Sequence, residues 1–418
     1  MRAVAIVDGE HYASVVRHAL AELPYEFAAA VLVGGQEKLR GGEDYGVPLV
    51  ADVGAAIERY EPDVVVDLSD EPVLGPAERL QLASRVLARG VPYVGADFRF
   101  DPPERAPFAV PSIAVVGTGK RVGKTAVTGH LARLLAAEHD VVVVAMGRGG
   151  PLEPEVVTIP PTVEALVDLS RSGRHAASDH LETAAVAGVS TVGCRRCGGG
   201  LAGAVAVSNV GDGAAVAAGL APDLVVFDGS GAALPPIAAD STVVVVGGHQ
   251  NPDVVAGYLN TYRLLVADVA VVTMADHDAR WEMVRDRVAG AVRPGTPVVA
   301  TTLHPRPLVD VRDRTVAYFC AAPVAAHAQL RAHLEAVHGA RIVHVSGNLA
   351  NRVALHDELA DISADVYLVE LKAAAIDVVA EGALGRGAEV ALAANDVVSV
   401  SGEPDLDELL LGMAKLQV

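Results

Sequence analysis

The sequence contains little lysine, few aromatic residues and almost no cysteine. Only five of its 33 basic residues are lysines, and the rest are arginines. Aromatic residues make up 4% of the 418 residues, so the core has to be built from valine, alanine and leucine. Three cysteines are too few for the disulfide framework of small secreted domains, which predicts a protein of a reducing compartment.

The sequence also lacks an excess of basic residues and long apolar runs. Its net charge of −19 excludes general binding to nucleic acids or membrane surfaces, which needs basic surface. No apolar run reaches the roughly 18 residues of a membrane-spanning helix. The N-terminal "MRAVAIVDGEH" becomes acidic after seven residues and is typical of a strand, not of a signal peptide. We therefore expect a cytoplasmic protein that concentrates its cations in a site.

Short valine-rich runs alternate with helical patterns along the whole chain. In the first hundred residues the runs are "AVAIVDG", "AAAVLVGG", "DVVVDLSD" and "VPYVGAD". Continuous apolar strands between helices predict an α/β fold with a mostly parallel sheet that is covered on both faces. Four prolines in residues 97–112 interrupt the pattern. We expect an N-terminal α/β domain at 1–105, a core domain at 106–330, and a C-terminal α/β extension at 331–418 packed on the core.

One segment, "GTGKRVGKT", has the composition of a phosphate-binding loop. It follows the strand pattern "IAVV" and precedes the helical pattern "TAVTGHLARLLAAEH". This order points backbone N–H groups and a helix N-terminus at an anion. Lys124 can reach the β- and γ-phosphates, and the Thr125 hydroxyl can bind Mg²⁺. The predicted nucleotide-binding residues are Gly117, Thr118, Gly119, Lys120, Arg121, Val122, Gly123, Lys124, Thr125 and Ala126.

The loop departs from the strict G-x-x-x-x-G-K-T pattern at one position. That pattern requires glycine at 118, where this chain has Thr118, and the first glycine lies one residue earlier. The longer form resembles the loop of dethiobiotin synthetase and its relatives. Partition-type ATPases carry a second lysine at the position of Gly119, so the sequence disfavours that class. A glycine-rich turn without a ligand is also disfavoured, because strand, loop, Lys-Thr pair and helix coincide.

Two further strand ends carry residues that could complete this site. Asp228 follows "LVVF" and could hold Mg²⁺ or its water, the alternative being that it only caps a turn. Arg148 follows another strand in "AMGRGGP", at the sheet edge where open α/β folds bind ligands. The alternative for Arg148 is a surface side chain in a tight turn.

The segment "GCRRCGGGLAGA" combines arginines, cysteines and glycines. Arg195 and Arg196 before three glycines predict a flexible cradle for an anion, the alternative being a solvated basic loop. Cys194 and Cys197 alone would make an incomplete zinc site, and Cys320 could join them only if the fold brought it there.

The end of the first strand, "VDGEHY", supplies a third group of polar residues. Because open α/β folds bind ligands at the carboxyl ends of their strands, Asp8, Glu10 and His11 are candidates for substrate binding. The alternatives are a simple Asp-Gly turn and a histidine that packs in the core. No G-x-S-x-G or H-E-x-x-H motif is present, so the sequence gives no support for a serine hydrolase or a zinc protease.

The ordered set "DGEHY", "GTGKRVGKT", "MGRGGP", "CRRCGGGLAGA" and "FDGSGAALPP" resembles the cyclic 2,3-diphosphoglycerate synthetases over essentially the whole chain. The resemblance implies a homodimeric, ATP-dependent ligase that closes 2,3-diphosphoglycerate into its cyclic pyrophosphate and releases ADP and phosphate. It also implies that the domain at 1–105 is a substrate-binding lid and that the domain at 106–330 is a P-loop nucleotide-binding core. The implied cofactors are ATP and Mg²⁺, with GTP and K⁺ as open alternatives. Two other classes stay open: another P-loop kinase or ligase acting on a phosphorylated acid, and a nucleotide-dependent switch or metal-delivery NTPase.

This reaction needs fixed positive charge, because it brings two phosphates of one molecule into contact. One phosphate would be activated by the γ-phosphoryl group of ATP, and the other would then attack it and expel phosphate. The expected catalytic residues are Lys124, Lys120, Arg148 and Asp228. The expected substrate contacts are Asp8, Glu10, His11, Arg148, Arg195 and Arg196, and the expected metal ligands are Thr125 and Asp228.

Overall fold

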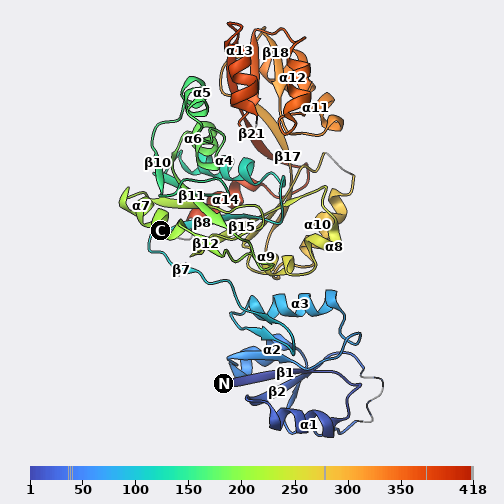
Figure 1. Ribbon diagram of the computed structural model, residues 1–418. Coiled ribbons are helices and arrows are strands. Elements are labelled where there is room, and N and C mark those ends of the chain that lie inside the picture. The colour runs from blue at the N-terminus through green and yellow to red at the C-terminus, as the bar shows by residue number, and fades with distance from the viewer. Residues whose placement is uncertain (36, 38, 40, 277–278, 373, 416–418) are drawn as a thin grey trace. The chain divides into compact units, whose positions relative to one another are not determined.

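The computed structural model describes residues 1–35, 37, 39, 41–276, 279–372 and 374–415 (Figure 1). The chain forms two compact units. Unit 1 comprises Met1–Glu104, Asn251–Ala267 and Arg287–Gly295, and unit 2 comprises Arg105–Gln250, Asp268–Asp286 and Thr296–Val418. Among the described residues, no helix is both long enough and apolar enough to span a membrane.

Unit 1 is an α/β domain with a six-stranded sheet in the order β3-β2-β1-β4-β5-β6. All neighbours in it are parallel except β5 and β6. Strands β2 and β3 are added on one side of β1 and β4 on the other, and such a switch in strand order is the position at which open parallel sheets leave a crevice. The strands are β1 (Arg2–Val7), β2 (Glu26–Leu32), β3 (Leu49–Val50), β4 (Val64–Asp67), β5 (Tyr93–Val94) and β6 (Arg99–Phe100), and the helices of this part are α1 (Ala13–Glu22), α2 (Val53–Tyr60) and α3 (Pro76–Leu87).

A segment from the middle of the chain belongs to unit 1. It holds α8 (Pro252–Val255) and α9 (Asn260–Leu265), and α9 packs against α3. The Ser84 hydroxyl of α3 donates a hydrogen bond to the carbonyl of Tyr258, at 3.0 Å. The sequence pattern does not predict this return of the chain, because the contact joins residues 174 positions apart.

Unit 2 contains, within the described residues, a thirteen-stranded sheet. Its first part is parallel except for β10 and β12, and β8 (Ser112–Gly117) lies between β13 (Leu224–Asp228) and β15 (Ser241–Gly247). Every residue of these three strands is buried, as expected for strands covered on both faces. The other elements are β7 (Ala106–Pro107), β9 (Val141–Gly147), β10 (Glu155–Val157), β11 (Ser190–Cys197), β12 (Val207–Ser208), β14 (Ile237–Ala238), β16 (Val269–Thr273), α4 (Lys124–Leu135), α5 (Val163–Arg171), α6 (Asp179–Ala187), α7 (Val210–Gly219) and α10 (Trp281–Ala289). The last residues of α10, from Arg287 onward, belong to unit 1. The predicted fold class is confirmed.

The C-terminal part of unit 2 continues the same sheet through β17 and β21, which pair antiparallel. Strands β20 and β18 follow in parallel to β21, and β19 pairs with β18. The elements of this part are β17 (Val298–Pro307), β18 (Thr315–Phe319), β19 (Arg341–Ser346), β20 (Val366–Glu370), β21 (Glu389–Ser399), the 3-10 helix η2 (Val324–Ala326), α11 (His327–His338), α12 (Arg352–Leu359), the π-helix η3 (Ala375–Ala380), α13 (Glu381–Leu384) and α14 (Leu406–Lys415).

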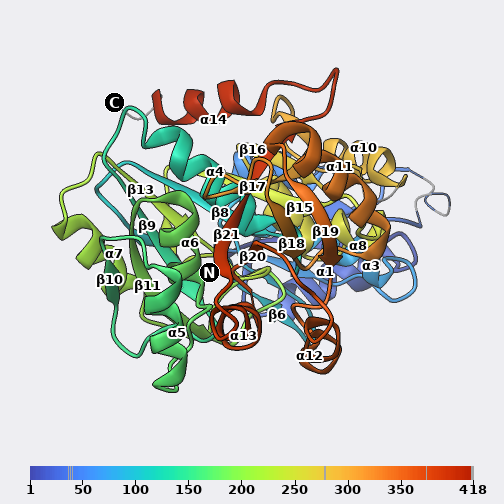
Figure 2. The same cartoon turned by 90° about the horizontal axis from the view of Figure 1, so that it is seen from above.

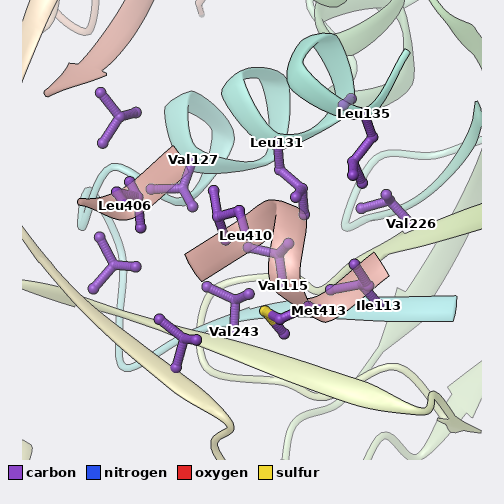
Figure 3. Close-up of a cluster of buried hydrophobic side chains, with 14 of the residues drawn as sticks. Ile113, Val115, Val127, Leu131, Leu135, Val226, Val243, Leu406, Leu410 and Met413 are labelled. Carbon is purple, nitrogen blue, oxygen red and sulfur yellow. The ribbon is translucent and has the colours of Figure 1, made fainter. Parts of the chain in front are cut away.

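The last helix packs against α4, the helix that follows the phosphate loop (Figure 2). Leu410 of α14 and Leu131 of α4 are fully buried in one apolar cluster with Val115 of β8 (Figure 3). Outside the cluster, His130 of α4 is 2.6 Å from the Asp407 carboxylate of α14. The helix that begins at Lys124 therefore has a fixed position relative to the sheet.

Candidate active site

The phosphate loop connects β8 to α4 at the carboxyl edge of the unit 2 sheet. Gly123 has φ = 75° and Arg121 has φ = 58°, both in the left-handed region that glycine tolerates best. A Cβ atom at Gly123 would lie 3.1 Å from the Thr273 hydroxyl and 3.2 Å from Leu303. At Gly117 a Cβ atom would lie 2.7 Å from the carbonyl oxygen of Gly231. These two glycines are needed for the conformation and close packing of the loop.

Threonine at position 118, where the strict pattern has glycine, ties the loop to β15. The Thr118 hydroxyl donates to the Gln250 side-chain oxygen at 2.6 Å, and the Thr118 backbone N–H donates to Val245 at 3.0 Å. The same Gln250 oxygen accepts from the N–H of Gly247 at 2.9 Å. On the other side of the loop, the buried Thr273 hydroxyl donates to the carbonyl of Val122 at 2.7 Å. Sequence reasoning missed Gln250 and Thr273, because neither is near the loop in the chain.

Lys124 and Asp228 form an ion pair at the centre of the site. The Lys124 ammonium lies 2.5 Å from one carboxylate oxygen of Asp228, and the Thr128 hydroxyl donates to the same oxygen at 2.6 Å. Burial raises the pKa of Asp228, and both contacts oppose that rise. The protein itself thus neutralises the charge of Lys124. Thr128 is a further residue that the sequence did not reveal, although it lies one turn after Lys124.

The residues at this point fit a magnesium ion. The second carboxylate oxygen of Asp228 has no hydrogen-bond partner among the described residues, and the Thr125 hydroxyl lies in the first turn of α4. Hydroxyl and carboxylate oxygens are ligands that Mg²⁺ prefers, and Mg²⁺ normally completes its shell with phosphate oxygens and water. Across the described ranges, no group of three or more His, Cys, Asp and Glu side chains could hold a metal ion alone.

Two arginines from different strands meet beside the phosphate loop. A Cβ atom at Gly231 would lie 2.6 Å from Nη2 of Arg148 and 3.9 Å from Nη2 of Arg196. The Arg196 guanidinium donates to the carbonyl of Ser230 at 2.9 Å, and its buried Nε has no partner within the described part of the chain. Burial and the nearby charge of Arg148 lower the pKa of Arg196. Like charges held this close predict a site for an anion.

The basic residues of this edge are not neutralised by carboxylates. Counting only residues that the structure describes, no ion pair links a carboxylate to Lys120, Arg121, Arg148, Arg195 or Arg196. Lys120, Arg121 and Arg148 are exposed, so a ligand can reach them.

The segment around Arg195 is a strand and not the flexible loop that its glycines suggested. It forms the end of β11 because β12 pairs with it, Arg196 opposite Ser208. Successive side chains of a strand point to opposite faces, so Arg195 does not share the face of Arg196. Cys194 is buried and Cys197 is exposed, and both belong to the described residues for which no metal group is found. Burial raises the pKa of Cys194 to about 12, which keeps its thiol protonated.

The N-terminal candidates lie at the carboxyl edge of the unit 1 sheet. Asp8 is fully buried, and its carboxylate accepts the N–H groups of Glu10, His11 and Asp70 and contacts the His11 ring at 2.8 Å. Burial would raise the pKa of Asp8, but these hydrogen bonds outweigh it and the pKa lies below its ordinary value. The His11 side chain is 31% exposed, and its other nitrogen is 3.6 Å from the Asp70 carboxylate.

A second buried carboxylate lies beside Asp8 in the same sheet. Asp67 accepts hydrogen bonds from Ser69 at 2.6 Å and from the Tyr93 hydroxyl at 2.5 Å, and it pairs with Arg79 at 3.4 Å. The carboxylates at this edge therefore hold the protein's own loops in place.

Comparison with known proteins matches three segments of the chain to the domains of one family. The chain matches the cyclic 2,3-diphosphoglycerate synthetase N-terminal domain at residues 2–101, its P-loop domain at 112–301 and its C-terminal domain at 307–396. It is 49% identical to a cyclic 2,3-diphosphoglycerate synthetase of Rubrobacter xylanophilus and 44% identical to one of Thermococcus gammatolerans, over 99% of this chain and 97% of each relative. A relative of the same name from Methanothermobacter thermautotrophicus is 38% identical over 99% of this chain and 96% of the relative.

Proposed function

The chain belongs to the cyclic 2,3-diphosphoglycerate synthetase family, and we propose that it uses ATP to close 2,3-diphosphoglycerate into its cyclic pyrophosphate. ADP and inorganic phosphate are the other products. The observation that carries the proposal is the arrangement at Gly231. There the loop after Asp228 touches the first glycine of the phosphate loop and lies against both Arg148 and Arg196. Nucleotide phosphates and a second anion can therefore be held side by side.

The reaction proceeds in two phosphoryl transfers. In the first, an oxygen of one substrate phosphate attacks the γ-phosphorus of ATP, the bond to the β-phosphate breaks, and ADP leaves. In the second, an oxygen of the other substrate phosphate attacks the activated phosphorus, and inorganic phosphate leaves as the P–O–P ring bond forms. No protein nucleophile is needed, so the protein contributes positioning and charge neutralisation.

Each residue of the unit 2 site has its own role in binding and charge neutralisation. Lys124 leaves Asp228 to neutralise the β- and γ-phosphates, and Lys120 and Arg121 supplement it from the exposed side of the loop. Thr125 and the released carboxylate of Asp228 would hold Mg²⁺, and the ion would supply positive charge at the phosphates. Arg148 binds the substrate phosphate at the shared edge. Arg196 supports it there, and Arg195 acts from the opposite face of β11 as an outer contact for the anion.

In unit 1, Glu10 and His11 contact the substrate, and Asp8 acts through His11 by fixing its ring. Unit 1 serves as the substrate-binding lid of the enzyme. We further propose that the enzyme is a homodimer and that it is cytoplasmic; its three free cysteines support the second point. Light scattering of the purified protein tests the dimer.

The decisive experiment is incubation with ATP, Mg²⁺ and 2,3-diphosphoglycerate, followed by ³¹P NMR and by assays for ADP and phosphate. We expect new pyrophosphate-type signals, with one ADP and one phosphate released per ring formed. A phosphorylated product without free phosphate would instead identify a kinase and refute the proposal. ATP hydrolysis without any change in the substrate signals would refute it as well.

A further inference from the structure

A third lysine, Lys372, forms a largely enclosed ion pair away from the phosphate loop. Its ammonium contacts the carboxylate of Glu182, which forms no other ion pair among the described residues. The Glu182 side chain is 10% exposed and the Lys372 side chain 36% exposed. Lys372 follows β20 by two residues, and Glu182 lies on α6, so the pair links the C-terminal part of unit 2 to its P-loop part. Neither residue has a role in the mechanism above.

Strand register shows that β20, the strand before Lys372, ends at an edge that faces the carboxyl end of β16. Strand β16 runs parallel to the start of β17, where Val272 is opposite Ala300. Strand β20 runs antiparallel to β17, because it is parallel to β21, and its last residue Glu370 is level with Pro307. The carboxyl ends of β16 and β20 therefore point toward each other along β17. The six residues between them, at about 3.3 Å each, span roughly 20 Å.

Helix α6 connects the two edges. Asp179 and Glu182 are three residues apart on it and therefore lie on one side of the helix. A Cβ atom at Gly147, the residue before Arg148, would lie 3.2 Å from the Asp179 carboxylate. Besides burial and their immediate partners, the pKa values of Arg196 and Lys372 both respond to the charge of Asp179. Lys372 is thus about one helical turn from the carboxylate that lies against the Arg148 turn.

The charge of the substrate requires more cations than the two arginines supply. Each phosphate monoester carries about −1.5 to −2 at neutral pH, so two of them with a carboxylate carry roughly −4 to −5. Arg148 and Arg196 together supply two positive charges. The phosphate-loop lysines are occupied by the nucleotide.

We propose that Lys372 binds an anionic group of the phosphorylated substrate, and that Glu182 holds its ammonium in place until the substrate arrives. This inference rests on the proposed function. It assigns to the C-terminal part of the chain a direct contact with the substrate, and it makes Glu182 the partner of the ammonium in the free enzyme, which the substrate displaces.

Substitution of Lys372 tests the contact. We expect Lys372→Met to raise the KM for 2,3-diphosphoglycerate at least tenfold while the Kd for ATP changes less than twofold, and Lys372→Arg to recover part of the loss. Arg171→Met is the matched control, because Arg171 and Glu381 form an exposed ion pair that links the same two parts at 2.9 Å. Arg171→Met should leave the KM unchanged. An unchanged KM in Lys372→Met would overturn the inference.

Glu182→Gln separates substrate binding from a purely structural ion pair. The substitution releases Lys372 but keeps its charge, so the KM for 2,3-diphosphoglycerate should stay the same or fall. An increase matching that of Lys372→Met would show that the pair only supports the fold.

Chemical modification of the wild-type enzyme provides a test that does not depend on the folding of a variant. Acetylation of lysines with acetic anhydride is followed peptide by peptide by mass spectrometry. We expect 2,3-diphosphoglycerate without ATP to slow acetylation of Lys372 at least threefold, and ATP alone to protect Lys124 but not Lys372. Equal acetylation of Lys372 with and without 2,3-diphosphoglycerate would refute the contact. Failure of the proposed function would appear separately, as the absence of cyclic product in the ³¹P NMR experiment.

Discussion

The carboxyl edges of the two parallel sheets are built from similar strands but treat charge in opposite ways. At the edge of unit 1, Asp8 and Asp67 are buried and accept hydrogen bonds from neighbouring loops and from Tyr93. At the edge of unit 2, Arg148 and Arg196 lie close together, and no carboxylate within the described residues pairs with either. The buried carboxylates of the first edge are satisfied by the protein itself, whereas the second edge keeps arginines without a carboxylate partner.

This difference teaches how to separate structural from functional charges at strand ends. A buried carboxylate that is fully hydrogen-bonded stabilises the fold, and replacing it should cost free energy of unfolding. Cations placed together without partners cost stability through repulsion, and they are useful only when an anion binds between them. Lys124 is the intermediate case, because its partner Asp228 is also a candidate metal ligand.

The largest effect is expected from Lys124→Ala, which removes the central cation of the unit 2 edge. ATP turnover should fall by at least about a hundredfold to a thousandfold, because a fixed charge on the transferred phosphate is lost. The measurement is ADP release under saturating ATP. Because Asp228 is left buried without its lysine, Lys124→Ala/Asp228→Asn serves as the control for folding. Activity of either variant near the wild-type level would contradict the role of Lys124.

Arg148→Ala should have a smaller effect, confined to the substrate. We expect a tenfold to hundredfold loss in kcat/KM for 2,3-diphosphoglycerate, with an unchanged Kd for ATP measured by calorimetry. Arg174→Ala is the matched control, because Arg174 is exposed and already paired with Glu155 at 2.8 Å. If Arg148→Ala turns over normally at low substrate concentration, the unpaired arginines have no role in substrate binding.

The sequence predicts features that are local in the chain and misses those that join distant segments. The phosphate loop and the α/β fold class follow from contiguous patterns. The structure places Asp228 and Arg148 at the carboxyl edge because Asp228 ends β13 and Arg148 directly follows β9. The Thr118–Gln250 and Lys372–Glu182 contacts join residues 132 and 190 positions apart, so no short pattern indicates them. For the same reason, the sequence gives no sign that residues 251–267 belong to unit 1.

Asp8→Asn tests whether the buried carboxylates at the edge of unit 1 stabilise the fold. Both Asp8 oxygens accept N–H groups, so the NH₂ group of an asparagine would have to face an N–H donor. We therefore expect the free energy of unfolding to fall by about 1–3 kcal/mol. The measurement is urea unfolding, and the Kd for ATP should not change. Asp44→Asn is the control, because Asp44 is an exposed partner of Arg17. Loss of ATP binding without a change in stability would show that Asp8 is not structural.

The smallest expected effect is a difference between Glu182 and Asp8 in how their contributions to stability depend on pH. Burial raises the pKa of Glu182 to about 7, although Lys372 opposes the rise. A carboxyl group with a raised pKa contributes stability below its ordinary value of 4.5, and that contribution is lost as the pH rises through about 7. The pKa of Asp8 is lowered from 3.8, so its contribution is complete above that pH and is lost only in acid.

Between pH 4.5 and 7, the free energy of unfolding of the wild type relative to Glu182→Gln should therefore decrease. Relative to Asp8→Asn it should stay constant over the same range. Urea unfolding of the three proteins at four pH values within this window measures both differences. A parallel decrease for both variants would mean that burial governs the two carboxylates alike, and the contrast between the hydrogen-bonded edge of unit 1 and the lysine-paired acid of unit 2 would have no energetic basis.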